Sequence, residues 1–177
     1  MSDASDRAAA LDPETLEFLQ TVFDLVRAGD TAQLTPLLDH GLPANLTNHR
    51  GDTLLMLASY HGHLELTRQL LQHGADPERP NDQGQTPLLG AAFKGDLPMV
   101  DLLLEHGADV ESRSPDGKTA LMMAAMFNRT AIVTRLLERG AQLSARAVDG
   151  TSALDAARLM GAADTAAQLE ALMDQAL

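Results

Sequence analysis

The sequence contains no cysteine and no tryptophan, and its aromatic residues are limited to one Tyr and four Phe. Without thiols, the chain cannot form a disulfide framework, a thiolate metal site or a cysteine nucleophile. Aromatic residues make up only 3% of the chain, so Leu, Ala, Met and Val must supply most of the core packing. The absences therefore predict a core of small and medium-sized aliphatic side chains.

Basic residues are also scarce. The chain has 13 Lys and Arg against 25 Asp and Glu, and its formal net charge is −12. Nucleic acids and anionic membranes attract proteins through Lys and Arg, so we expect neither as a partner. No segment approaches the roughly 18 apolar residues of a membrane span. Residues 1–7 are polar, unlike a signal peptide, and we therefore expect a soluble protein of the cytoplasm.

Glycine recurs at an interval of 33 residues along most of the chain. The series are Gly51, Gly84, Gly117 and Gly150; Gly41, Gly74, Gly107 and Gly140; and Gly29, Gly62, Gly95 and Gly161, with Asn128 where the last series should have a fourth glycine. A fixed period of this length indicates stacked supersecondary units instead of a globule with one centre.

The units share more than glycine. Residues 84–88 read GQTPL and residues 117–121 read GKTAL, while residues 102–110 read LLLEHGADV and residues 135–141 read RLLERGA. These motifs resemble ankyrin repeats, and the small chain is similar to stand-alone ankyrin proteins of bacteria. The resemblance implies an all-α solenoid of about five stacked repeats, each a helix–turn–helix with a short hairpin. The Thr of the motif is expected to cap the first helix of each repeat with its hydroxyl.

The period divides the chain into one cooperative array over residues 14–177. We expect a disordered tail at 1–13, an N-terminal capping repeat at 14–46, full repeats at 47–79, 80–112 and 113–145, and a C-terminal capping repeat at 146–177. Residues 12–14 (DPE) predict the first helix start, because Asp caps free amides and Pro suits the first turn. With a cap at each end, the chain is expected to be a complete protein.

Three positions carry specific expectations. Asn128 replaces a turn glycine and should adopt the same left-handed backbone, which Asn tolerates better than most residues. Gly90 falls inside a helix, where it should cost about 1 kcal/mol relative to Ala. Leu104 is expected in the core, so that its truncation to Ala should cost about 2–5 kcal/mol.

Histidine is the first residue type to consider for chemistry. His61 and His63 have a spacing that could suit a metal, but no carboxylate or Cys completes a closed ligand set. His63 also occupies a position where repeats of this kind use a structural histidine. A second series, His40, His73 and His106, recurs at 33 residues near helix ends and is interpreted as structural. No catalytic motif is visible, so we expect no enzyme, cofactor or metal.

Exposed first-helix positions and hairpin tips are where ankyrin proteins contact partners, and two columns of large side chains occupy the helix positions here. Exposed apolar patches with Met and aromatic residues are typical of interfaces, although these side chains could instead shield the helix–hairpin junction. The tips are mixed and mostly acidic, which would suit a partner with a basic rim. The candidate residues are Tyr60, Phe93, Met126 and Leu159; His61, Lys94, Phe127 and Met160; and, on the tips, His49, Arg50, Asp52, Asp82, Gln83, Gln85, Asp116 and Lys118.

The expected function is a non-catalytic scaffold-like module, a monomer that binds an unidentified protein or peptide on its concave face. One alternative is an inhibitor or immunity-type protein that occludes an enzyme. A second is a metal-binding or enzymatic protein built on His61 and His63. A third is a structural element that self-associates through the apolar columns.

Overall fold

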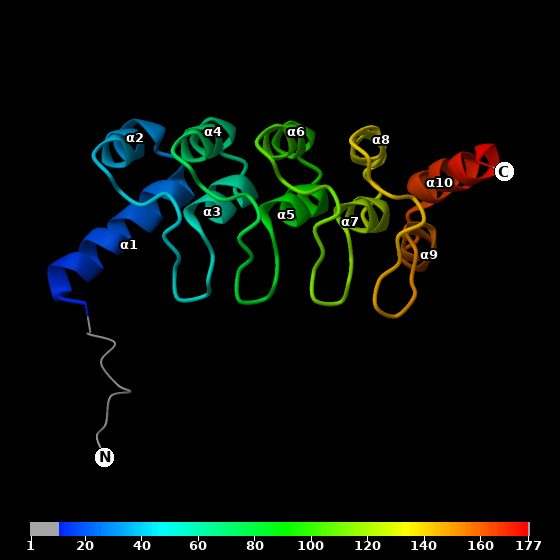
Figure 1. Ribbon diagram of the computed structural model, residues 1–177, viewed down its shortest axis with the longest axis horizontal. Helices are drawn as coiled ribbons and strands as arrows, with labels where there is room; N and C mark the ends of the chain where they lie inside the picture. The colour runs from blue at the N-terminus through cyan, green and yellow to red at the C-terminus, as the bar shows by residue number, and fades with distance from the viewer. Residues whose placement is uncertain (1–10, 177) are drawn as a thin grey trace, which may run out of the picture.

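The computed structural model describes residues 11–176, which form ten α-helices in five consecutive pairs. The helices are α1 (Pro13–Ala28), α2 (Thr31–Asp39), α3 (Leu54–Tyr60), α4 (Leu64–Gln72), α5 (Pro87–Lys94), α6 (Leu97–Glu105), α7 (Ala120–Met126), α8 (Thr130–Glu138), α9 (Ala153–Leu159) and α10 (Ala163–Gln175). The first helices of the pairs form one row and the second helices another, and a loop projects before each of α3, α5, α7 and α9 (Figure 1). The expected all-α solenoid is therefore confirmed.

Helix α1 differs from the other first helices. It begins as predicted, with the Asp12 carboxylate accepting from the Thr15 amide at 2.9 Å, and it ends at Gly29, which has φ 71°. Most of the expected tail at 1–13 lies outside the described residues. The part of α1 in register with the later hairpins is helical, so α1 has 16 residues where α3 has seven. Even so, no helix within residues 11–176 is long and apolar enough to cross a membrane.

The short helices α3, α5 and α7 begin directly after the Thr of the repeat motif, and α9 begins after Ser152. The Thr53 hydroxyl accepts from the Met56 amide at 3.0 Å, and the Thr119 hydroxyl accepts from the Met122 amide at 3.4 Å. The predicted caps are thus present in α3 and α7. Thr86 precedes α5 but makes no side-chain cap, and its buried hydroxyl has no hydrogen-bond partner in the described part of the chain.

A continuous apolar core separates the two helix rows. Leu103 of α6 is fully buried, whereas Leu104 is only partly buried against the core. Successive helical residues point about 100° apart, and in α6 the buried side falls on Leu102 and Leu103, which leaves Leu104 at its margin. The expectation that Leu104 is the core position is therefore wrong by one residue. The leucines equivalent to Leu103 in α4 and α8, Leu70 and Leu136, are fully buried as well.

A ladder of polar contacts connects neighbouring repeats beside the second helices. In each step, a side-chain oxygen of one repeat accepts a hydrogen bond from a backbone amide of the next, 31 residues later. These contacts fix the stacking of neighbouring units in addition to apolar burial. The three steps are Asn45 to Asp76 at 2.8 Å, Glu78 to Asp109 at 2.9 Å and Glu111 to Gln142 at 2.8 Å.

The hairpins are 47–53, 80–86, 113–119 and 146–152, and hydrogen bonds join them in two pairs. The Asp82 amide donates to the Arg50 carbonyl at 3.1 Å, and the Val148 amide donates to the Asp116 carbonyl at 2.9 Å. Pro115 occupies the equivalent position of the third hairpin and has no N–H to donate. No hydrogen bond therefore joins the hairpins 80–86 and 113–119, both of which the structure describes.

Candidate functional site

A groove of about 720 Å³ runs along the first helix row, between α3, α5 and α7 and the three hairpins 47–53, 80–86 and 113–119. Its floor is apolar and its far edge, made by the hairpins, is polar. The apolar floor residues are Met56, Leu57, Tyr60, Leu89, Phe93, Met123, Met126 and Phe127. A volume of this size is typical of sites that bury a small ligand or part of a peptide.

The structure brings most of the predicted interface residues together around this groove. From the helix columns, those lining it are Tyr60, His61, Phe93, Met126 and Phe127; from the hairpins, they are His49, Arg50, Asp52, Gln83, Gln85, Asp116 and Lys118. Lys94 instead lines a smaller adjoining cavity that shares Tyr60 and His61. The residues that line neither cavity are Asp82, Leu159 and Met160.

Leu159 and Met160 show where the predicted columns stop lining the groove. Leu159 is 83% exposed at the end of α9, and Met160 is 49% exposed. In α5 and α7 the equivalent residues have a following repeat beside them, but α9 has none within the described chain. The two predicted columns therefore line the groove over three repeats only, and in the C-terminal repeat their side chains, Leu159 and Met160, are exposed.

The floor is built from specific ring contacts. The rings of Phe93 and Phe127 meet edge to face with centroids 4.7 Å apart, a favoured geometry for aromatic pairs. The Lys94 ammonium lies 4.5 Å from the centroid of the Tyr60 ring. A side chain at Gly90 would begin 3.5 Å from the Tyr60 ring, so glycine keeps the floor open beside Tyr60. Gly90, for which the sequence predicts a cost in helix stability, thus leaves space in the groove.

Several groove residues were not predicted from the sequence, although the repeat pattern held a signal for them. Leu57, Gly90 and Met123 lie three residues before Tyr60, Phe93 and Met126, one helical turn earlier on the same face. Arg27 lies 33 residues before Tyr60, in the equivalent position of the first repeat, and also lines the groove. Thr86 could not be predicted as a groove residue in this way, because its motif predicts a role in capping the helix.

The hairpin edge is held in place by its own side chains. Asn48 and Asn81 each fold their side-chain oxygen over the hairpin and accept two backbone amides of the same loop. This arrangement presents the tip side chains from a fixed backbone, which lowers the entropic cost of binding a partner. The amides are those of Arg50 and Asp52 for Asn48, and of Gln83 and Gln85 for Asn81.

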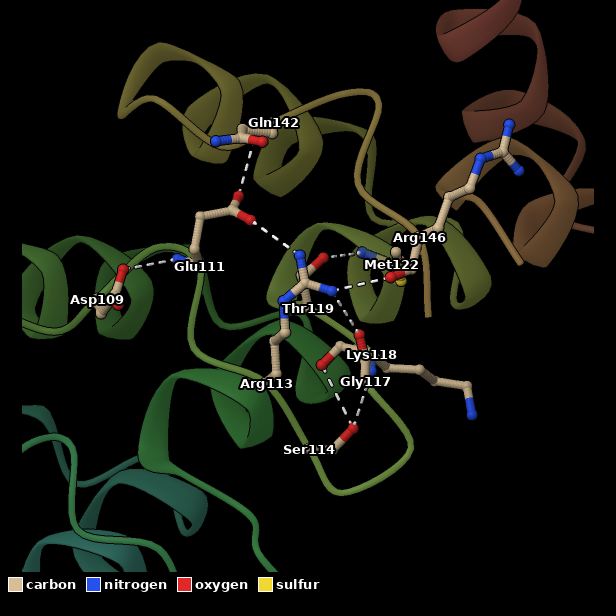
Figure 2. Close-up of polar contacts among 10 residues, drawn as sticks. All are labelled: Asp109, Glu111, Arg113, Ser114, Gly117, Lys118, Thr119, Met122, Gln142 and Arg146. Carbon is tan, nitrogen blue, oxygen red and sulfur yellow. Dashed lines mark hydrogen bonds and ion pairs between the residues drawn. The ribbon is translucent and has the colours of Figure 1, made fainter. Parts of the chain in front are cut away.

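Arg113 holds the third hairpin against the next one. Its guanidinium donates to the Gly117 carbonyl at 3.2 Å and to the Arg146 carbonyl at 2.8 Å, and it pairs with Glu111 at 3.5 Å (Figure 2). The same Glu111 carboxylate accepts the Gln142 amide of the ladder (Figure 2). The Arg113–Glu111 pair therefore connects the third hairpin, at the edge of the groove, to the ladder contacts beside the second helices.

The histidines considered for metal binding have structural contacts. The rings of His61 and His63 lie stacked with centroids 6.1 Å apart. His63 Nε2 donates to the Arg27 carbonyl at 2.7 Å, which ties the second repeat to the first. Within residues 11–176, no group of three or more His, Asp or Glu is placed to hold a metal ion, so nothing in the geometry favours that alternative.

The second histidine series closes the ends of the second helices. The Nδ1 atoms of His40, His73 and His106 bond to the carbonyl four residues earlier, at 2.7, 2.7 and 2.9 Å. His73 also bonds through Nε2 to the Asp39 carboxylate at 2.9 Å. The hydrogen bond to Asp39, and then that to the Gln69 carbonyl, raises the pKa of His73 above its usual value.

This pKa shift predicts a pH-dependent contribution to stability. Because the folded pKa is raised, the contribution is fully present below the unfolded pKa near 6.5 and is lost as the pH rises through the folded pKa. Its size should be on the order of 0.5 kcal/mol, as for other exposed ion pairs. Urea unfolding of the wild type and His73→Gln should therefore differ more at pH 5.5 than at pH 8.5. His106→Gln is the control, since it removes the Nδ1 contact without an ion pair; an equal gap at both pH values would contradict the assignment.

Comparison with known proteins agrees with this geometry. The family model for ankyrin repeats (3 copies) matches residues 22–114 and again 91–172. A Pseudomonas aeruginosa protein that carries the name of an ankyrin repeat protein is 59% identical over 58 residues, a segment that spans 33% of this chain and 34% of that relative. Ankyrin repeats are generally protein–protein interaction modules and typically non-catalytic. With the 33-residue period, the paired helices and the hairpins, these matches show that the chain belongs to the ankyrin-repeat family.

Proposed function

We propose that this protein is a non-catalytic module that binds an extended segment of a partner protein in the groove along α3, α5 and α7. The observation that carries the proposal is the combination of an apolar floor with a fixed polar edge over three repeats. Apolar floor contacts supply affinity, and the edge supplies orientation and specificity.

The Thr86 hydroxyl supports an extended segment in particular. The residue is 5% exposed, lines the groove and has no hydrogen-bond partner within residues 11–176. A buried hydroxyl without a partner is costly, and the backbone of an extended segment would offer it both donors and acceptors. The oxygen itself is buried in the free protein, so a bound main chain would reach it only after the Thr86 side chain rotates toward the groove.

Tyr60 should be an anchor for such a segment. We expect Tyr60→Ala to weaken binding by about 2 kcal/mol, or about 30-fold in the dissociation constant, because it removes a half-exposed ring from the groove floor. The measurement is affinity capture from an extract of the native cells, followed by titration calorimetry with the captured protein. The fold should survive, since the ring is not part of the buried core.

Leu159→Ala provides a matched control. It also removes a large exposed apolar side chain from a first-row helix, but from outside the groove. Capture that Tyr60→Ala weakens and Leu159→Ala leaves intact would support the groove. Capture that both leave intact, or that Leu159→Ala alone weakens, would place recognition elsewhere and contradict the proposal.

A further inference from the structure

The acidic residues in the groove are already satisfied by their neighbours. Asp52 accepts from the side-chain amides of Asn48 at 3.2 Å and Asn81 at 2.9 Å. Asp116 is bonded by Lys118 and Ser114, and the Lys118 contact, followed by that of Ser114, lowers the pKa of Asp116. Lys118 therefore neutralises Asp116 in part, whereas Asp52 keeps its charge but has both oxygens hydrogen-bonded to neighbouring amides.

Some of the Lys and Arg side chains, unlike these two carboxylates, lack a bonding partner in the described chain. In a chain with so many acidic residues, most Lys and Arg side chains pair with a carboxylate, and within residues 11–176 only Arg50, Arg79, Lys94 and Arg129 do not. Arg79 and Arg129 donate to backbone carbonyls instead. The Arg50 guanidinium and the Lys94 ammonium make no hydrogen bond in this part of the chain; Lys94 only lies over the Tyr60 ring.

Arg50 belongs to the repeat that carries Tyr60, and the Lys94 ammonium of the next repeat lies over the Tyr60 ring. Arg50 lines the groove together with Tyr60, and Lys94 lines the adjoining cavity, which Tyr60 also borders. Lys94 and Arg27 also lie near His61, whose pKa is lowered first by burial and then by His63, Lys94 and Arg27. The Tyr60 end of the groove thus has two cations without a carboxylate partner among the described residues. Asp96 also lines the cavity of Lys94, but its carboxylate caps α6 by accepting from the Met99 amide at 3.2 Å.

We propose that the partner segment carries an Asp or Glu side chain that binds at the Tyr60 end of the groove, near Arg50 and Lys94, with apolar side chains following along Phe93 and Phe127. This inference rests on the proposed function and specifies the chemistry of its ligand. It reverses the expectation of a partner with a basic rim. A carboxylate here would gain charge-assisted hydrogen bonds that the protein's own acidic groups do not make.

The length of the segment follows from the stacking. Packed helices lie about 10 Å apart, so the floor from α3 to α7 extends for roughly 20 Å. An extended chain advances about 3.3 Å per residue, and six or seven residues would therefore cover it. The acidic residue should stand at one end of this stretch and the apolar residues should occupy the rest.

The test is selection from a phage-displayed library of random seven-residue peptides on the full chain. Fusion to the coat protein leaves the peptides no free C-terminal carboxylate, so any acidic preference must come from side chains. The wild type should enrich peptides that combine Asp or Glu with apolar residues. Replacing the acidic residue of a selected peptide by its amide should weaken binding about fivefold at low salt, as expected for a partly exposed ion pair.

The double variant Arg50→Gln, Lys94→Gln should lose this discrimination and bind the acidic and amide peptides within about twofold of each other. Arg79→Gln is the control, since it removes an unpaired cation that lines neither cavity. Peptides enriched without an acidic preference, or with a basic one, would overturn this inference and leave the proposed function standing. No enrichment on the wild type would contradict the proposed function itself.

Discussion

Truncation of Leu103 to alanine is expected to lower the free energy of unfolding by about 2–5 kcal/mol, the range found for leucines in well-packed cores. The Leu103 side chain is fully buried in α6, which packs on α5 and between α4 and α8. Its loss removes apolar burial and leaves a cavity that the flanking helices can fill only in part. For a chain of this size, the melting temperature should fall by roughly 4–20 °C.

The position of α6 in the middle of the array enlarges the effect. In a repeat protein, stability is the sum of the repeats and the interfaces between neighbours, and α6, which holds Leu103, takes part in the interfaces on both sides. Leu104→Ala in the same helix is the control, because Leu104 is only partly buried and should cost clearly less. Urea and thermal unfolding followed by circular dichroism measure both. A loss from Leu104→Ala equal to or larger than that from Leu103→Ala would contradict the core described here.

Asn128→Ala should give the second largest loss, about 2–3 kcal/mol. Asn128 has φ 58°, the left-handed conformation predicted for it, and an alanine there is strained by about 1 kcal/mol or more. Its side chain has a further role, since Oδ1 accepts from the amides of Asp164 at 3.1 Å and Thr165 at 3.0 Å. These amides belong to the first turn of α10, whose own N-cap residue, Ala162, provides no side-chain acceptor.

Asn128 therefore has two roles: it adopts a left-handed backbone and it caps α10 of the next repeat. A glycine variant can separate them. Asn128→Gly restores the residue found at this position in the other repeats and keeps the backbone conformation, but it removes the cap. We expect it to cost about 1 kcal/mol, the usual value of a cap. Urea unfolding ranks the variants, and hydrogen exchange at Asp164 and Thr165 locates the change. A glycine variant as stable as the wild type would show that the cap contributes nothing.

The sequence predicted the architecture because its signals are local and repeated. The glycine period, the Thr before each first helix and the DPE start of α1 each determine a short stretch of backbone. The left-handed conformation of Asn128 belongs to the same class, since it depends only on that residue and its neighbours. Its capping role does not, because the amides that it binds lie 36 and 37 residues later and are reached only through the stacking of repeats.

The candidate groove was predicted in part, for a similar reason. The columns of Tyr60 and Phe93 follow from the repeat register, and the structure places both on one floor. The exposure of Leu159 depends on what stacks beside α9, which the register does not describe. The choice between Leu103 and Leu104 depends on the rotation of α6, which two adjacent leucines cannot define.

Charge is the property that composition described least well. Counting residues gives mostly acidic hairpin tips, but stability and binding depend on which charges remain unpaired. Asp52 and Asp116 are bonded within the hairpins, while Arg50 is not. Such pairing depends on distances between side chains, within one hairpin for Asp116 and partly between repeats for Asp52, and these distances become visible only in three dimensions.

Pro115 in the third hairpin affects how the hairpins along the groove are joined to one another. Hydrogen bonds join the first two hairpins to each other and the last two to each other, whereas Pro115 meets the second hairpin only by packing over Gly84, where even one added carbon would lie 2.4 Å from the proline ring. Widening the groove at this step breaks no backbone hydrogen bond. The polar edge therefore consists of two hydrogen-bonded pairs of hairpins, and we expect it to widen first at the step between Gly84 and Pro115, where no backbone hydrogen bond joins the two described hairpins.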